Sequence, residues 1–318
     1  IRELADLMQI PVITTMMGIS VFPDDDQLFC GMIGTHGVKM ANAAVNECDV
    51  LFLVGARVGD RAVKTPLALE KTTKIIHIDI DPAEIGKNIG ADLPLVGDAK
   101  LVLQQMTELA KPMKHDEWIA HIKTLGGERK YVEPAKGTVN PRVFIDRLAK
   151  KMPANVTVVA DVGQNQIWTC TEYKFRKEGR LLTSGGMGTM GYSVPAAIGA
   201  KMADDSRATV AICGDGAFQM SFMELATAVQ FGVDIKVAVM TNNRLGMVRE
   251  LQTNGYHDRQ TAVFLDGSPD FIKLAEAYGI PAMRVYDDAT MEKGVEMLAE
   301  HKGICLVEVV VDKDMPTL

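Results

Sequence analysis

Short apolar runs, rich in valine and isoleucine, alternate with stretches of helical character along most of the chain. The clearest runs are 11–15, 49–54, 74–79, 155–160, 181–183, 208–213, 235–241 and 304–310. A strand that is buried on both faces is apolar throughout, and parallel strands need long connections, usually helices. The alternation therefore predicts an α/β fold with parallel sheets in three-layer α/β/α domains.

The stretches between these runs are expected to form helices, and one carries a clear start signal. Asn140 followed by Pro141 is typical of an N-cap and the first helical position. The helices are expected at 1–10, 36–47, 99–110, 116–125, 141–151, 164–175, 193–203, 219–231, 269–278 and 290–300.

The composition changes in the middle of the chain, where lysines, a glycine pair and a proline interrupt the apolar pattern. We expect a first domain at 1–115, a linker at 116–140 and a second domain at 141–318, and a chain of 318 residues has room for about two domains. The chain opens on Ile1 directly in a helical pattern. We therefore expect it to be a piece of a longer protein.

Charge and cysteine usage exclude several classes of partner. The formal net charge of −7 argues against nucleic acid or an anionic membrane as the main partner. No apolar stretch reaches the roughly 18 residues of a membrane span, and the N-terminus has no signal-peptide pattern. The cysteines lack metal-binding spacing and are expected to be reduced thiols of a cytoplasmic protein: Cys30, Cys48, Cys170, Cys213 and Cys305.

Four segments of the second domain follow a predicted strand, and three of them carry glycines. Ligands of open parallel sheets bind beyond the carboxyl ends of the strands. Glycine lets the backbone approach an anion, and the helix that follows offers unpaired N–H groups to a phosphate. The segments are DVGQNQ (161–166), TSGGMGTMG (183–191), CGDGAF (213–218) and TNNRLGM (241–247).

Two oxygen-bearing side chains stand at matched positions in these segments. Asp215 and Asn242 each follow an apolar run, and a carboxylate, an amide carbonyl, a backbone carbonyl and phosphate oxygens suit an octahedral Mg²⁺ site. Alone, each segment could be a plain turn or a tight strand-to-helix connection. Their joint occurrence, in order and each after a strand, predicts a metal and diphosphate site.

The spacing from GDG to NN resembles the metal–diphosphate motif of thiamine diphosphate enzymes. More specifically, TSGGMGTMGYSVPAAIGA (183–200), VGQNQIW (162–168) and LGMVRELQ (245–252) are similar to the catalytic large subunit of acetohydroxyacid synthase, also called acetolactate synthase. The likeness covers nearly the whole chain. It implies a central flavin-type domain followed by a thiamine diphosphate-binding domain.

The resemblance assigns roles to individual residues around the thiamine cofactor. The Gly188 carbonyl would accept a hydrogen bond from the 4′-amino group, and Met190 would hold the cofactor bent, although Met190 could also be a plain core methionine. The Mg²⁺ ligands would be the side chains of Asp215 and Asn242 and the carbonyl of Arg244. The remaining contacts to the cofactor would come from Val162, Gly163, Gln164, Asn165, Gly216, Ala217, Gly246 and Met247.

A second likeness lies in the first domain, in GTHG (34–37), GARVGDR (55–61), HIDIDPAEIGKN (77–88) and GDAK (97–100). It implies FAD, which takes no net redox part in the family reaction. Two alternatives stay open: Asp79 and Asp81 could cap a turn before Pro82, and His36 could be a helix-start residue. The residues expected to line the flavin are His36, Arg57, Asp79, Ile80, Asp98 and Ala99.

The sequence departs from the family pattern at three places. Asn165 stands where a histidine is common, Val58-Gly59 replaces the usual Phe-Asp, and Leu251 stands where synthases that favour 2-ketobutyrate carry tryptophan. The first departure alters the diphosphate loop and the second bears on the flavin. The third leaves the preference for the acceptor keto acid open.

The family reaction decarboxylates pyruvate and joins the hydroxyethyl unit to a second 2-keto acid, in branched-chain amino acid biosynthesis. The resemblance also implies a homodimer or homotetramer and a regulatory small subunit. In the family, a glutamate of an N-terminal domain activates the cofactor across the dimer interface. No segment here matches that domain, so this chain alone is expected to be inactive. The chain is also expected to lack the first strand of the central domain, which would weaken flavin binding.

Other classes stay open at this point. One is a different thiamine diphosphate enzyme, such as a pyruvate oxidase or a 2-keto-acid decarboxylase. Another is a non-catalytic cofactor-binding protein of the same fold. A nicotinamide dehydrogenase is disfavoured because no GxGxxG follows an early strand with an acidic residue about 20 positions further on.

Overall fold

The computed structural model describes residues 1–127, 131–176 and 178–318. The contacts between residues divide the chain into two compact units, Ile1–Arg129 and Lys130–Leu318. This division falls inside the stretch 116–140 in which a linker was predicted. The limits of the functional domains at 115 and 141 stay a prediction.

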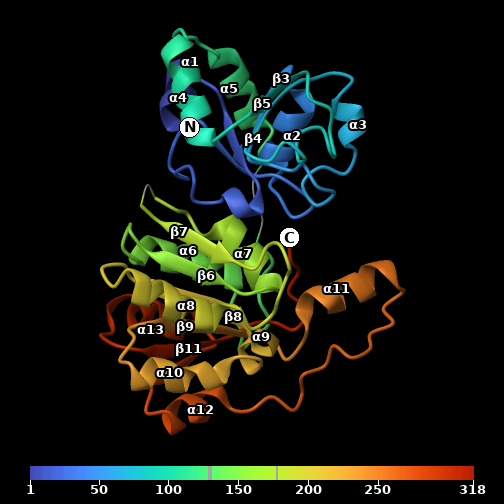
Figure 1. Ribbon diagram of the computed structural model, residues 1–318. Coiled ribbons are helices and arrows are strands. Elements are labelled where there is room, and N and C mark those ends of the chain that lie inside the picture. The colour runs from blue at the N-terminus through green and yellow to red at the C-terminus, as the bar shows by residue number, and fades with distance from the viewer. Residues whose placement is uncertain (128–130, 177) are drawn as a thin grey trace. The chain divides into compact units, whose positions relative to one another are not determined.

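The first unit contains parallel strands in two separate sheets (Figure 1). One sheet has the order β3-β4-β5, and the other pairs β1 with β2. Its strands are β1 (Val12–Thr14), β2 (Phe29–Met32), β3 (Val50–Val54), β4 (Lys74–Asp79) and β5 (Leu93–Val96). Its helices are α1 (Arg2–Met8), η1 (Met16–Gly18, a 3₁₀ turn), α2 (Lys39–Glu47), α3 (Pro66–Leu69), α4 (Ala99–Leu109) and α5 (Asp116–Thr124).

The second unit is built on a six-stranded, wholly parallel sheet of order β10-β11-β9-β8-β6-β7. Its strands are β6 (Thr157–Ala160), β7 (Arg180–Thr183), β8 (Thr209–Gly214), β9 (Lys236–Thr241), β10 (Ala282–Val285) and β11 (Cys305–Val310). Its helices are α6 (Pro141–Lys151), α7 (Gln164–Glu172), α8 (Ser193–Ala203), α9 (Asp215–Gln219), η2 (Phe222–Glu224, a 3₁₀ turn), α10 (Leu225–Gln230), α11 (Gly246–Gly255), α12 (Phe271–Ala277) and α13 (Asp288–Glu300).

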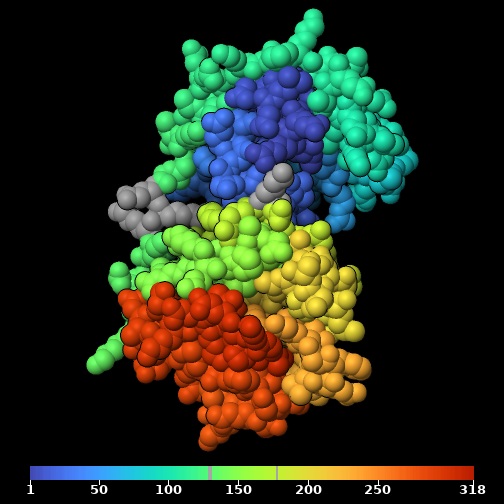
Figure 2. All heavy atoms as spheres, turned by 90° about the vertical axis from the view of Figure 1, so that its left-hand side faces the viewer, coloured from blue at the N-terminus to red at the C-terminus, as the bar shows by residue number. Residues whose placement is uncertain are grey.

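Helices cover both faces of this sheet, as the predicted α/β fold requires. Helices α8, α9, α10 and α12 bury one apolar cluster against the strands, with Phe218 and Phe271 at its centre. Helices α6, α7 and α13 pack on the other face, where Gly294 of α13 lies against Val307 and Phe144. Figure 2 shows the side of this unit on which the last part of the chain, in red, reaches the surface. The fold class predicted from the alternating pattern is confirmed.

The expected strands all form, and Asn140 caps α6 by accepting hydrogen bonds from the N–H groups of Arg142 and Val143 at 2.9 and 3.4 Å. The continuous helix expected at 219–231 is wrong. The chain is already helical from Asp215 and then breaks at Ser221, whose φ of −143° lies outside the helical region. Short edge strands such as β5 and β10, and helix α11, which begins at a glycine, were not predicted.

Asp161 fastens two of the loops at the carboxyl edge of the sheet. It directly follows β6, is fully buried, and accepts a hydrogen bond from the Val162 N–H at 2.8 Å. It also accepts hydrogen bonds from the N–H groups of Gly191 at 3.0 Å and Ser193 at 2.8 Å, where α8 begins. The glycine-rich segment after β7 is therefore tied to the segment after β6 by one carboxylate.

Among the described residues, none of the helices has both the length and the apolar character of a membrane span.

The buried thiols are predicted to be unreactive. Burial raises the pKa of Cys30 and Cys305 to about 11 and that of Cys170 to about 12, and it raises the pKa of Cys213 well above the usual value. Because the thiolate is the reactive form, a disulfide reagent at pH 8 should rapidly modify at most the half-buried Cys48. A spectrophotometric thiol assay measures this, with the unfolded protein as reference. Rapid modification of buried thiols in a Cys48→Ser variant would contradict the prediction.

The Asp161 contacts predict a large loss of stability when the carboxylate is changed. In Asp161→Asn, the NH₂ end of the amide faces a backbone N–H that had donated to the carboxylate. That buried N–H therefore loses its hydrogen-bond partner. Hydrogen bonds to charged groups contribute about 1.5–3 kcal/mol each, and a loss in that range is expected in urea unfolding. As a matched control, Asp146→Asn removes only a surface ion pair with Lys150 and should cost below about 1 kcal/mol. Equal losses in the two variants would refute the structural role of Asp161.

Candidate functional site

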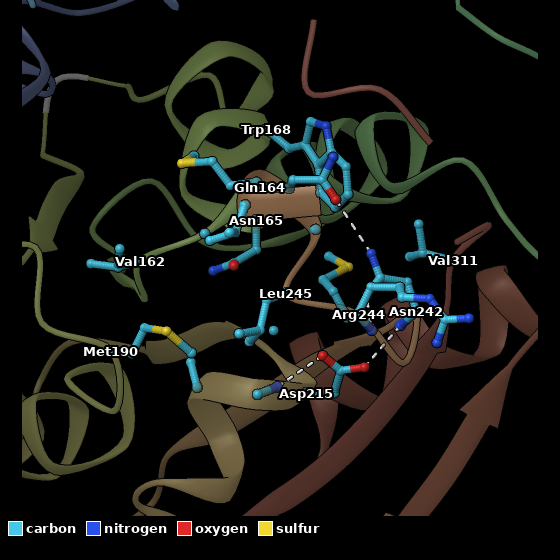
Figure 3. Close-up of a pocket in the computed structure, with 18 residues that line it drawn as sticks. Val162, Gln164, Asn165, Trp168, Met190, Asp215, Asn242, Arg244, Leu245 and Val311 are labelled. Carbon is cyan, nitrogen blue, oxygen red and sulfur yellow. Dashed lines mark hydrogen bonds between the residues drawn. The ribbon is translucent and has the colours of Figure 1, made fainter. Parts of the chain in front are cut away.

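A cavity of about 120 Å³ lies at the carboxyl edge of the six-stranded sheet in the second unit (Figure 3). It is lined by the loops that follow β6, β7, β8 and β9, which are four adjacent strands of the sheet. The predicted site residues brought together there are Val162, Gly163, Gln164, Asn165, Met190, Asp215, Gly216, Ala217, Asn242, Arg244, Gly246 and Met247. The sequence had not singled out Trp168, Gly214, Met240, Leu245, Val248 and Val311, which also line it.

Asp215 stands at the centre of this edge, as the first residue of α9. Its side chain is 1% exposed and accepts three backbone hydrogen bonds: from Gly216 at 2.8 Å, from Asn242 at 3.1 Å and from Asn243 at 2.6 Å. Burial raises the pKa of Asp215 to about 6, and the three N–H donors oppose that rise. The carboxylate is thus a buried negative charge that ties the end of β8 to the end of β9.

Asn242 directs its two amide atoms to different partners (Figure 3). Its Oδ1 accepts a hydrogen bond from the Arg244 N–H at 3.0 Å, and its Nδ2 donates to Gln164 Oε1 at 3.3 Å. The Arg244 guanidinium makes other contacts, with Asp266 at 2.8 Å and over the Phe264 ring at 4.7 Å. Arg244 can therefore contribute its backbone at this edge while its charge is used elsewhere.

Asn243 has a backbone role that the sequence reasoning missed. Its φ of 54° lies in the left-handed region, which asparagine tolerates better than most residues. This conformation turns its N–H toward Asp215 and its carbonyl toward the Leu265 N–H, at 3.0 Å. A paired Asn-Asn after a strand was the available signal, because asparagine is enriched at positive φ.

The loop after β6 leads into helix α7, and the side chain of Asn165 holds it in place. Gly163 has φ 142° and stands just before α7, where a side chain would be strained. Asn165 is 3% exposed, and its Nδ2 donates to the carbonyls of Asp161 at 2.8 Å and Ile212 at 3.1 Å. Asn165 therefore joins the end of β6 to β8.

The glycine-rich loop after β7 carries two predicted site residues, Met190 and Gly188, which lie differently with respect to the cavity. Met190 lines the cavity and also packs against the apolar cluster around Phe218. This position is compatible with a core methionine, and its predicted contact with the cofactor stays a prediction. Gly188 has φ +68° and its N–H donates to the Ser184 carbonyl at 2.9 Å. Gly188 is not one of the residues that line the cavity in the described part of the chain.

The donor set fits a hard divalent cation better than a transition metal. Within the described residues, no group of three or more histidine, cysteine or acidic side chains could hold a metal, and no ion pair neutralises Asp215. What the site offers is one buried carboxylate, the Asn242 amide oxygen and backbone oxygens. Such oxygens suit Mg²⁺, which is bound by few protein ligands together with phosphate oxygens and water.

The flavin candidates lie in the first unit, mostly at the carboxyl ends of its three-stranded sheet. Arg57 follows β3, Asp79 ends β4 and Ile80 follows it. Asp98 caps α4 by accepting from the Leu101 N–H at 3.1 Å. Ala99 opens the same helix. These positions come together because β3, β4 and β5 are neighbours in register.

Asp79 and Asp81 make the turn-capping hydrogen bonds that were the alternative to flavin binding. Asp79 accepts from the Asp81 N–H and Asp81 accepts from the Ala83 N–H, both at 2.9 Å, so both carboxylates do cap the turn. His36 follows β2 in the other sheet, and its loop is held by the Thr35 N–H, which donates to the Arg61 carbonyl at 2.9 Å. Ile80 is 72% exposed.

Comparison with known proteins agrees with this geometry. The thiamine pyrophosphate enzyme C-terminal TPP binding domain matches residues 161–309, and the thiamine pyrophosphate enzyme central domain matches residues 1–106. A probable acetolactate synthase large subunit of Methanocaldococcus jannaschii is 41% identical over 322 residues, covering 98% of this chain and 54% of the relative.

Two further relatives give similar figures. The acetolactate synthase large subunit of Lactococcus lactis is 36% identical over 314 residues, covering 98% of this chain and 54% of the relative. An acetolactate synthase of Mycobacterium bovis is 39% identical over 330 residues, covering 98% and 52%. The chain thus spans about half the length of the curated relatives it matches. The chain belongs to the thiamine pyrophosphate enzyme family, and acetolactate synthase large subunits are its relatives within that family.

Proposed function

We propose that this chain forms the central and thiamine diphosphate-binding parts of an acetolactate synthase that also requires Mg²⁺. Its reaction would decarboxylate pyruvate and join the hydroxyethyl unit to a second 2-keto acid, for branched-chain amino acid biosynthesis in the cytoplasm. The observation that carries the proposal is the buried Asp215, which has no cationic side-chain partner among the described residues and lies beside Asn242 at the ends of adjacent strands. The similarity to acetolactate synthases over nearly the whole chain supports it.

In this proposal, Asp215, the Asn242 oxygen and the Arg244 carbonyl would hold the metal, which would supply positive charge for a diphosphate. The N–H groups at the start of α7 and the loop after β8 would bind that diphosphate, because a helix N-terminus favours an anion. Gly216 lies where a side chain has little room, since a Cβ there would come within 2.8 Å of the Leu245 side chain and 3.3 Å of Met190. Met190, Gly188 and Met247 would contact the rest of the cofactor.

Bound thiamine diphosphate would supply an electron sink for decarboxylation of a 2-keto acid. The residues of this chain would position that cofactor, and the apolar side chains of Leu245, Met190 and Val248, which line the cavity, would lie beside it. Asp215 is the one carboxylate among the described residues that line the cavity. We therefore place the group that activates the cofactor outside this chain, in a partner copy or another segment, and propose that the chain alone does not turn over.

The remaining assignments complete the proposal. FAD would bind in the first unit at Arg57, Asp79, Asp98 and the residues beside them, with His36 at its edge. The assembled enzyme would be a homodimer or homotetramer and would bind a regulatory small subunit. Two alternatives, a pyruvate oxidase and a 2-keto-acid decarboxylase, would give a different product. The third, a non-catalytic protein of this fold, would give no product.

An activity assay tests this proposal directly. The 318-residue chain is mixed with thiamine diphosphate, Mg²⁺ and pyruvate, and acetolactate is measured by colour reaction. We expect no sustained turnover from the chain alone, and acetolactate when the part of a relative that this chain does not cover is supplied. Robust acetolactate from the chain alone would overturn the proposal that the activating group lies outside this chain, whereas acetyl phosphate, acetate or free aldehyde as product would favour the alternatives.

Changing the proposed metal ligand should abolish cation-dependent binding. Asp215→Asn removes the negative charge from the cavity while keeping the size of the side chain. We expect Mg²⁺-dependent binding of thiamine diphosphate, measured by calorimetry, to weaken at least about tenfold, since even outer partners of a metal contribute that much. Asp266→Asn is the matched control, because Asp266 is exposed and faces Arg244. Unchanged binding in a folded Asp215→Asn protein would show that Asp215 is not a ligand.

A further inference from the structure

The amide of Gln164 has its orientation fixed by the groups around its nitrogen. Gln164 is 4% exposed, and Nε2 donates to the Met315 carbonyl at 2.9 Å, to Glu250 Oε2 at 3.2 Å and to Thr317 Oγ1 at 3.2 Å. A carbonyl and a carboxylate can only accept hydrogen bonds. The nitrogen of Gln164 must therefore face Glu250 and Met315, and the oxygen must face the other way.

The oxygen of Gln164 in turn fixes Asn242. Gln164 Oε1 accepts from Asn242 Nδ2 at 3.3 Å, which leaves Asn242 Oδ1 on the side of Arg244. Gly246 makes room for this arrangement, because a Cβ there would lie 1.9 Å from Gln164 Oε1. The two ends of an amide have nearly the same size, so hydrogen bonds decide which end faces a given partner. Only the oxygen end of Asn242 can bind a cation.

Glu250 is itself held in place by neighbouring segments. Its Oε2 accepts from the Thr317 N–H at 3.0 Å and from the Thr317 hydroxyl at short range. The segment that carries Thr317 is anchored nearby, where Trp168 Nε1 donates to the Pro316 carbonyl at 3.1 Å and Arg249 donates to the Met315 carbonyl at 3.3 Å. Glu250 on α11 therefore presents one fixed acceptor oxygen to Gln164. Helix α11 otherwise extends away from the sheet (Figure 1).

We propose that Glu250 is a positioning residue for the metal site. Through Gln164 it determines which end of the Asn242 amide faces the cation. The inference rests on the proposed function, in which Asn242 is a Mg²⁺ ligand, and it adds a residue that does not touch the metal. Without Glu250, the Met315 carbonyl is the one acceptor-only group left among the described partners of the Gln164 nitrogen, because the Thr317 hydroxyl can also donate. The Gln164 amide then turns over more readily, and a turned Gln164 leaves the Arg244 N–H as the one contact of the two that still keeps the Asn242 oxygen toward the cation.

The first test measures how much Mg²⁺ is needed for thiamine diphosphate to bind. In Glu250→Ala we expect the half-saturating Mg²⁺ concentration, measured by calorimetry at fixed thiamine diphosphate, to rise about 10-fold or more, as for other partners of metal ligands. Glu250→Gln should stay close to wild type, because its amide oxygen can replace Oε2. Asn254→Ala, which removes an exposed side chain of the same helix, is the matched control and should leave the concentration unchanged. No rise in Glu250→Ala would overturn the inference.

A second test separates positioning from a general loosening of the structure. Aspartate offers an oxygen at both ends, so in an Asn242→Asp background the orientation of the residue no longer matters. Glu250→Ala should then cost nothing in Mg²⁺ requirement, whereas it costs about tenfold when Asn242 is present. Equal losses in both backgrounds would mean that Glu250 only supports the fold and would refute the inference. If the unaltered chain shows no Mg²⁺-dependent binding, the proposed function fails, and this inference fails with it.

Discussion

The carboxylate of Asp215 is the group on which the carboxyl edge of the second unit depends. It accepts N–H groups from the start of α9 and from both asparagines after β9, so one side chain sets the spacing of two loops. Burying a charge is unfavourable unless it is compensated, and here the compensation comes from backbone dipoles, with no cationic side chain paired to it within the described residues. The absence of a cationic partner is the reason why the proposed Mg²⁺ site is placed at this edge.

Asp161 does for the neighbouring loops what Asp215 does for the central pair. Both follow a strand, both are buried, and both accept backbone N–H groups from a segment distant in sequence. They leave different possibilities open, however. Asp161 faces the start of α8, whereas Asp215 lines the cavity, so the same kind of contact is structural in one position and available to a ligand in the other.

The sequence predicted the sheet and the cavity better than it predicted the contacts inside them. Buried strands are readable because the pattern of a strand is local, and strand order in a parallel sheet then brings the ends of β6, β8 and β9 together. Short edge strands such as β10 carry too little apolar signal. The break at Ser221 was hidden because the surrounding residues keep a helical pattern while the true helix starts earlier, at Asp215.

Asn242 and Glu250 show why the hydrogen bonds inside the candidate site could not be predicted from the sequence. The position of Asn242 after a strand is a local fact, but the direction of its amide depends on Gln164, and the direction of Gln164 depends on Glu250 and on a segment near residue 317. Each of these contacts joins residues that are far apart in sequence, and none leaves a periodic pattern. A motif can therefore point to a candidate metal ligand, while the direction of its amide is set by tertiary hydrogen bonds that only the folded chain reveals.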